Sequence, residues 1–147
     1  DTEMPEAAKR HEGYLQAHKK MGVPVDPKLY IKSPFTAEEA QAALLGFLES
    51  GVAFDAIFAA SDLIAINAMG VLNARGFKVP EDIAVVGYDD VDAARHSFPP
   101  LTTVHQPLDL AARALLQSLQ EVMRGGQPAS RQLNSPLVIR ASSQNAS

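Results

Sequence analysis

The stretch that decides the fold is residues 76–90, which reads GFKVPEDIAVVGYDD. Its centre, Ile83 to Gly87, is an apolar run of strand length, and turn-forming residues 79–82 precede it. Such runs are typical of strands in a parallel sheet that is covered on both faces. The run therefore predicts a buried parallel strand, with the carboxylates of Asp89 and Asp90 at its carboxyl end.

Outward from this strand, helical patterns alternate with short β-rich segments, as in an open parallel α/β sheet. The clearest helix start is Thr36, an N-cap with Glu39 three residues later, and Gly51 ends that helix. We expect helices over residues 5–21, 36–50, 61–75 and 107–123. We expect strands over residues 29–31, 54–60, 83–87, 101–104 and 132–139, and a disordered polar tail over 142–147.

Three of the helices carry apolar faces that need a packing partner. Helix 61–75 is apolar almost all round, so it is either fully enclosed or shared with another subunit. Helix 5–21 has one apolar stripe, made of Ala7, Tyr14, Ala17 and Met21. Helix 107–123 has another, which we expect to face inward, made of Leu108, Ala112, Leu115, Leu119 and Val122.

Composition excludes several classes of protein. The 147 residues are 46% hydrophobic, which is enough for one globular unit with a core. The net charge of −4 and the scattered basic residues argue against direct nucleic-acid binding. The chain has no cysteine, which excludes disulfides and thiolate metal sites and fits a cytoplasmic location.

Signatures of membrane insertion, secretion and catalysis are missing as well. No apolar stretch approaches the roughly 18 residues of a membrane span, and no signal-peptide pattern is visible. The chain does not begin with Met, so we interpret it as a fragment. The histidines have no metal-ligand spacing, and no nucleophile-elbow or phosphate-loop motif occurs. We therefore expect no catalytic residue, no metal and no cofactor.

Candidate ligand-binding residues follow from one rule, that open α/β sheets bind ligands beyond the carboxyl ends of their strands. The rule selects Arg10, Phe35, Ser61 and Asp89. Each has a structural alternative. Arg10 donates either to a ligand or to an acid such as Asp89, and Phe35 is either a ring-stacking wall or a helix staple. Ser61 caps the next helix or reaches a ligand, and we assign Asp89 to the ligand and Asp90 to a helix cap.

Taken together, the motifs resemble the C-terminal part of the lactose/galactose-repressor family of transcription regulators, from about residue 5 to residue 143. The motifs are RHEGY (10–14), FT (35–36), FDAIFAASD (54–62), the opening stretch 76–90, PLTTV (100–104) and LVIR (137–140). The resemblance implies a three-layer α/β fold of the periplasmic-binding-protein-like type, in which two subdomains close over an effector. It implies that residues 1–104 form the C-terminal subdomain without its first strand, that 105–141 cross over to complete the other subdomain, and that 142–147 are a tail.

The resemblance also assigns roles to residues. Arg10 matches the effector-binding arginine, Phe35 the ring-stacking aromatic, Asp89 the acid that accepts from ligand hydroxyls, and Leu108 an apolar pocket wall. Ser61 departs from the pattern, since the lactose repressor has Asn there, and some relatives bind purines or nucleosides; the ligand's identity stays open. The dimer interface implied by the family comprises Ile64, Ala68, Val71, His96 and Phe98.

These observations predict a function. We expect the chain to be part of a cytoplasmic repressor that is not an enzyme. We expect this repressor to form a homodimer and to bind a sugar or sugar derivative. Operator DNA would be bound only through an N-terminal helix-turn-helix outside this chain, and no membrane partner is expected. The alternatives are a fragment of a periplasmic sugar-binding protein and, third, an enzyme that uses Asp89 or Asp90 as acid or base.

Overall fold

The computed structural model describes residues 5–32 and 36–144, with Ala37 described by its backbone alone. Its centre is a four-stranded sheet in the order β1-β2-β3-β4. The strands are β1 (Ala56–Phe58), β2 (Ala84–Asp89), β3 (Thr102–His105) and β4 (Leu137–Val138). The first three run parallel, with Ile57 beside Val85 and Asp89 beside His105, and β4 pairs antiparallel to β3. The predicted α/β class with a parallel sheet is confirmed.

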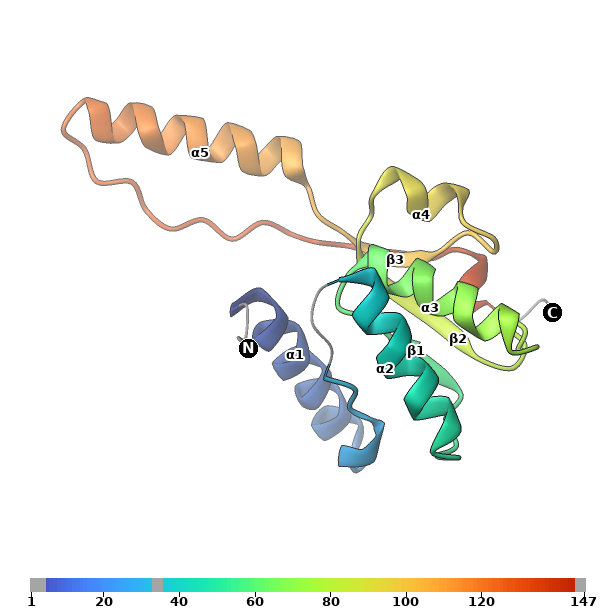
Figure 1. The fold of residues 1–147 in the computed structure, drawn as a ribbon. Coiled ribbons are helices and arrows are strands. Elements are labelled where there is room, and N and C mark those ends of the chain that lie inside the picture. The colour runs from blue at the N-terminus through green and yellow to red at the C-terminus, as the bar shows by residue number, and fades with distance from the viewer. Residues whose placement is uncertain (1–4, 33–35, 145–147) are drawn as a thin grey trace.

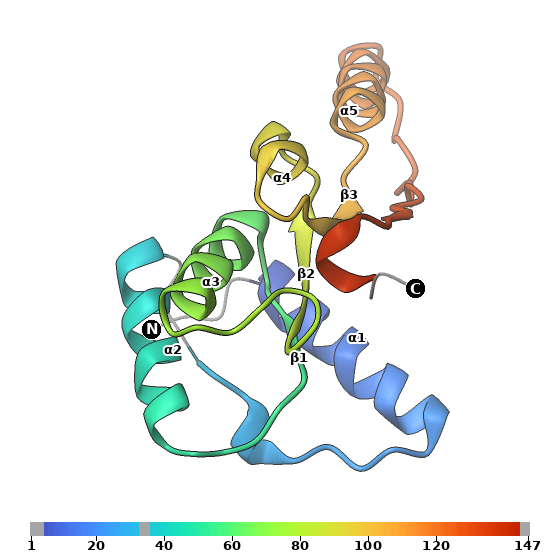
Figure 2. The same cartoon turned by 90° about the vertical axis from the view of Figure 1, so that its right-hand side faces the viewer.

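Helices cover the sheet on both faces, which gives the predicted three layers. Helices α2 (Ala37–Glu49) and α3 (Asp62–Ala74) lie on one side of the strands, and α1 (Pro5–Met21) lies on the other (Figure 2). The predicted N-cap at α2 is confirmed, because the Glu39 backbone N–H donates to Thr36 Oγ1 at 3.3 Å; the Glu39 carboxylate accepts from the Thr36 hydroxyl and not from the Thr36 N–H, so the capping box is only half formed. Gly51 ends α2 in the left-handed region, with φ at 71°.

The core lies between α3 and the sheet. Leu72, Val85 and Leu101 have no exposed surface and pack in one cluster of buried residues. A second cluster lies between α2 and α3, where Leu44 contacts Ala68 and Val71. The nearly all-round apolar character of α3 is therefore used mainly within the chain, on two faces at once.

The predicted strand at residues 29–31 is wrong. Residues Pro27–Leu29 form a 3-10 turn, η1, and Tyr30 is extended with φ −95° and ψ 113° but belongs to no ladder. A strand needs a hydrogen-bonding neighbour, and among the described residues the outer edge of β1 is paired with nothing. For the same reason β1 is not buried on both faces as predicted, and Phe58 is 43% exposed.

The bounds of helix α1 are as predicted, but its packing is not. It ends before Gly22, whose φ is 69°. None of its residues 5–21 is buried, and Met21, on the predicted stripe, is 77% exposed. The helix touches the sheet mainly at its carboxyl rim, through Arg10.

Helix α5 (Leu108–Met123) also has its predicted bounds, yet it projects away from the sheet (Figure 1). The predicted inward stripe is exposed, with Leu115 at 71%, Leu119 at 56% and Val122 at 54%. The described residues that follow it return alongside the helix as an extended segment (Figure 1). They meet the sheet at Pro136, whose carbonyl accepts from the His105 N–H at 2.9 Å, and at β4, which has two residues. The predicted strand over 132–139 is therefore much shorter than expected.

The end of the described chain is ordered, so the predicted disordered tail is wrong for residues 142–144. Residues Ala141–Ser143 form the 3-10 turn η2, and Ser142 is fully buried. Its Oγ donates to the Val85 carbonyl at 2.6 Å and accepts from the Thr102 N–H at 2.8 Å. Hydroxyl side chains thus fasten a polar segment to the sheet. Among the described helices, none combines the length and the apolar character that a membrane crossing requires.

Candidate functional site

The candidate site lies at the carboxyl ends of β1, β2 and β3, where Arg10 reaches over from α1. The Arg10 guanidinium donates through Nη1 to the Ala60 carbonyl just beyond β1. Its Cζ lies 3.9 Å from the centre of the Tyr88 ring, and its Nη2 lies 3.7 Å from Asp89 Oδ1. The arginine is only 17% exposed. These contacts hold the guanidinium, which carries five N–H donors, at the rim of the sheet.

Asp89 is the carboxylate that Arg10 faces. Its Oδ1 accepts a hydrogen bond of 2.5 Å from Gln106 Nε2, and its side chain is 27% exposed. Burial raises the pKa of the Asp89 carboxyl, although the Gln106 hydrogen bond and the Arg10 charge act to lower it. An ionised carboxylate in this place is short of hydrogen-bond donors, and ligand hydroxyl groups would supply them.

Gln106 is a candidate residue that our sequence analysis missed. It follows β3 directly, so the rule that selected the ends of the other strands applies to it equally. Its amide both donates to Asp89 and offers a carbonyl to the solvent side. The signal was present in the sequence, but we applied the rule to three strand ends and not to this one.

Leu108 stands where a pocket wall was predicted. It is the first residue of α5, is 68% exposed, and lines an open cleft of about 970 Å³ together with Asp89, Gln106 and Pro107. Arg10 is not among the residues that line this cleft, so the cleft meets the Arg10 contacts at Asp89. Phe35, the predicted aromatic wall, lies outside the described residues.

Ser61 is the N-cap of α3, which is the structural alternative we considered. Its Oγ accepts from the Ile64 N–H at 3.3 Å, and the residue is half-buried. A hydroxyl that accepts one hydrogen bond still has its own proton to donate. The cap and a ligand contact are therefore compatible.

Asp90 does not cap the following helix, so that assignment is wrong. Helix α4 (Asp92–His96) begins after Val91, whose N–H donates instead to Asp62 Oδ2 at 2.9 Å. Asp62 is fully buried, and its other oxygen accepts from Thr103 Oγ1 at 2.5 Å. Asp62 is thus the acid that fixes the turn after β2, and Asp90 is free for other contacts.

The residues predicted at a dimer interface divide into two groups. Phe98 is 96% exposed and His96 is 75% exposed, so both are on the surface, and Ile64 is half-buried. Ala68 and Val71 are 7% and 5% exposed and pack under α2. The prediction for these two is corrected: their apolar character serves the chain's own core, because α2 covers that face of α3.

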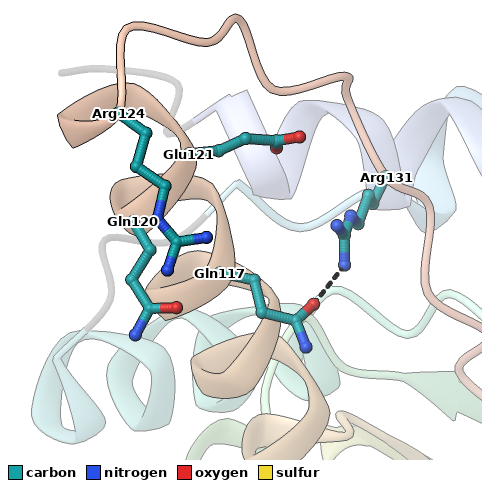
Figure 3. Close-up of a pocket in the computed structure, with 5 residues that line it drawn as sticks. All are labelled: Gln117, Gln120, Glu121, Arg124 and Arg131. Carbon is teal, nitrogen blue, oxygen red and sulfur yellow. Dashed lines mark hydrogen bonds between the residues drawn. The ribbon is translucent and has the colours of Figure 1, made fainter.

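A second hollow, of about 270 Å³, lies between α5 and the segment that follows it (Figure 3). Its lining consists of the polar residues Gln117, Gln120, Glu121, Arg124 and Arg131. Arg131 Nη1 donates to Gln117 Oε1 at 2.6 Å. Side chains of this kind give little apolar surface for a ligand to bury, so we place the candidate site at the rim of the sheet. Within residues 5–32 and 36–144, no three acidic or histidine side chains are grouped to hold a metal ion.

Fold and rim together define the class: an open α/β domain that presents polar side chains to a small molecule at the ends of its strands. Comparison with known proteins agrees. The family model described as "periplasmic binding protein-like domain" matches residues 1–143. The chain belongs to this family.

Relatives of the chain are transcription regulators. It is 38% identical over 142 residues to the HTH-type transcriptional regulator CelR of Thermobifida fusca, which covers 95% of this chain and 42% of the relative. It is 34% identical, with the same coverage, to the HTH-type transcriptional repressor CytR of Escherichia coli strain K12. The chain therefore spans about two fifths of the length of these curated relatives.

Solved structures give the same result. A transcriptional regulator CelR–cellobiose complex superposes with a TM-score of 0.86 at 39% identity, over 92% of this chain and 42% of that one. A sugar-binding transcriptional regulator of the LacI family from Escherichia coli, complexed with phosphate, gives 0.88 at 29% identity, over 97% and 51%. The predicted resemblance to the C-terminal region of lactose/galactose-repressor regulators is confirmed.

Proposed function

We propose that this chain is the effector-binding and dimer-forming part of a sugar-responsive transcription repressor. The observation that carries the proposal is the convergence of Arg10, Asp89 and Gln106 at one rim, beside the apolar wall of Leu108. A guanidinium, a carboxylate and an amide supply the donors and acceptors that sugar hydroxyls match, and the apolar wall suits the C–H face of a sugar ring. The cellobiose complex of the related regulator supports a sugar as the ligand class.

Within this proposal, residues 1–104 form one subdomain of the effector-binding core. Residues 105–141 cross over to a second subdomain, and the exposed apolar stripe of α5 supports this, since an unpaired apolar helix face needs a cover. The pocket then has two walls, of which this chain holds one. Operator DNA is bound through a helix-turn-helix outside this chain, and the protein acts in the cytoplasm.

The dimer surface is proposed around the exposed residues Phe98 and His96, and the half-buried Ile64 at the start of α3 is proposed to contribute to it. A fully exposed phenylalanine is apolar surface that a partner subunit would bury. The protein is not an enzyme in this proposal. Asp89 has an arginine and an amide beside it that suit hydroxyl recognition, and the named relatives are regulators.

A titration of the full-length protein with cellobiose, followed by calorimetry, tests the proposal. We expect binding by the wild type and at least about a tenfold loss of affinity in Arg10→Ala, since removing a charged hydrogen-bonding partner costs about 1.5–3 kcal/mol. Arg75→Ala is the matched control, because Arg75 is exposed just beyond the last residue of α3 and its ion pair in the described part of the chain is with Glu49.

Two results would count against the sugar-binding site. One is a wild type that binds neither cellobiose nor any sugar in a wider thermal-shift screen. The other is an Arg10→Ala variant that binds as tightly as Arg75→Ala. A nucleoside that stabilises the protein where sugars do not would keep the site and change its ligand class.

A further inference from the structure

Asp90, next to the proposed ligand carboxylate, is the buried centre of a charge cluster whose outer members, Arg95 and His105, have partly exposed side chains. Its side chain is 3% exposed. Arg140 Nη2 donates to Asp90 Oδ1 at 2.5 Å, and His105 Nδ1 donates to Oδ2 at 2.9 Å. Arg95 Nη2 lies 3.8 Å from the same Oδ2. Burial by itself would raise the pKa of Asp90, but these hydrogen bonds and charges outweigh it and lower the pKa. Asp90 is therefore held as a carboxylate.

The backbone at this point is strained. Asp89 has φ of 127° and Asp90 has φ of 58°, and both are in the region that favours glycine. Such a conformation persists only where its surroundings fix it. The contacts of the Asp90 side chain, and its N–H bond of 3.3 Å to Thr103 Oγ1, fix this backbone together with the bonds that Asp62 accepts from Val91 and Thr103. The direction of the Asp89 side chain depends on this same pair of residues.

Two of the three side-chain partners of Asp90, His105 and Arg140, come from the points where the projecting arm, residues 106–136, joins the sheet, and the third, Arg95, comes from α4. His105 is the last residue of β3, just before the chain leaves (Figure 1). Arg140 follows β4, just after the chain returns. Its Nη1 also donates to the Leu101 carbonyl at 2.8 Å, so its guanidinium bridges the sheet and Asp90. One carboxylate thus ties both ends of the arm to the turn that carries Asp89.

We propose that Asp90 is a positioning residue that aims the Asp89 carboxylate at the ligand and couples it, through His105 and Arg140, to the attachment of the arm. This rests on the proposed function in so far as Asp89 binds the ligand. The consequence is that a change in how the arm sits on the sheet reaches the ligand site through two hydrogen bonds. In turn, a ligand that hydrogen-bonds to Asp89 shifts the position of the arm on the sheet.

The competing explanation is that the cluster only stabilises the fold. Buried ion pairs are weak evidence for a net gain in stability, but breaking one leaves an unpaired charge and is destabilising. A purely stabilising role would lower the melting temperature of a variant without changing how tightly its folded form binds. A positioning role changes the affinity of the folded protein.

The experiment compares three variants of the full-length protein with the wild type, well below their melting temperatures. Asp90→Asn removes the charge and keeps the shape. Arg140→Lys keeps the charge but not the fork that bridges Leu101 and Asp90, and it serves if Asp90→Asn does not fold. Asp92→Asn is the matched control, because Asp92 is 89% exposed and close by.

In titrations with cellobiose, we expect Asp90→Asn to bind about tenfold more weakly than the wild type, Arg140→Lys to be intermediate, and Asp92→Asn to be unchanged. In the ligand-free proteins, we expect amide hydrogen exchange to rise together at residues 88–91, 105–108 and 137–140 in Asp90→Asn, and not in Asp92→Asn.

Folded Asp90→Asn with wild-type affinity would overturn the proposal, as would faster exchange confined to residues 88–91 or spread evenly over the chain. If the wild type itself does not bind cellobiose, the proposed function has failed with that sugar, and the exchange measurement still decides whether Asp90 couples the turn to the arm.

Discussion

At the scale of single residues, the buried Asp62 fixes the turn that follows β2. Ser61 and Asp62 are both residue types that commonly cap helices, yet in the structure they make different hydrogen bonds. Ser61 caps α3, while Asp62 crosses to the turn after β2 and accepts from Val91 and Thr103. Room for Asp62 comes from Gly87, where a Cβ would stand 2.3 Å from Asp62 Oδ1 and 2.9 Å from Leu101 Cδ2. The glycine is needed for close approach and not for its backbone angle.

This packing gives a stability prediction for Gly87→Ala. The added methyl group must displace Asp62 and Leu101, neither of which has exposed surface, so we expect a loss of about 1–3 kcal/mol in the free energy of unfolding. Gly70→Ala is the control: it lies in α3 with open space around it, and alanine there should raise stability by up to about 1 kcal/mol. Urea denaturation measures both, and equal effects of the two changes would contradict the account of Gly87.

At the scale of elements, α3 shows how an apolar helix divides its surface. Ala65 and Leu72 face the sheet, Ala68 and Val71 face α2, and Leu63 remains 56% exposed. Sequence periodicity indicated that α3 is either enclosed or shared, but it did not say which side chain met which neighbour. The proposed dimer surface consequently depends on Phe98 and its neighbours more than on the centre of α3.

Two aspartate substitutions separate core from interface. Phe98→Asp should leave the fold intact and shift the protein from dimer to monomer, since Phe98 is 96% exposed. Val71→Asp buries a charge between α2 and α3, and we expect it to unfold the protein or cost several kcal/mol, whatever its oligomeric state. Light scattering coupled to size exclusion, together with circular dichroism, distinguishes these outcomes. A folded Val71→Asp monomer, or a Phe98→Asp dimer, would reverse the two assignments.

At the scale of the whole molecule, the sequence predicted what depends on local pattern. Periodicity and capping residues predicted the helix bounds and the N-cap at Thr36. The apolar run predicted the strand after residue 83, and the rule on strand ends predicted that Arg10 and Asp89 lie at the rim. Features that depend on partners distant in the chain were wrong or missed. Tyr30 is extended but has no strand beside it, and Ser142 is buried because Val85 and Thr102 meet its hydroxyl.

The Asp90 cluster is another feature of that kind. Arg140 is 50 residues away from Asp90 in sequence, and no spacing rule relates the two. The resemblance to a family of regulators indicated which residues face the ligand, and the structure adds how the turn that carries them is fixed.

The most direct test of the central claim is a crystal structure of the full-length protein with a bound sugar. We predict sugar hydroxyl oxygens at about 2.7–3.0 Å from an Asp89 carboxylate oxygen and within hydrogen-bonding distance of the Arg10 guanidinium, with Leu108 against the ring. A sugar bound elsewhere, with Arg10 and Asp89 contacting only each other, would contradict the claim that this rim is the effector site.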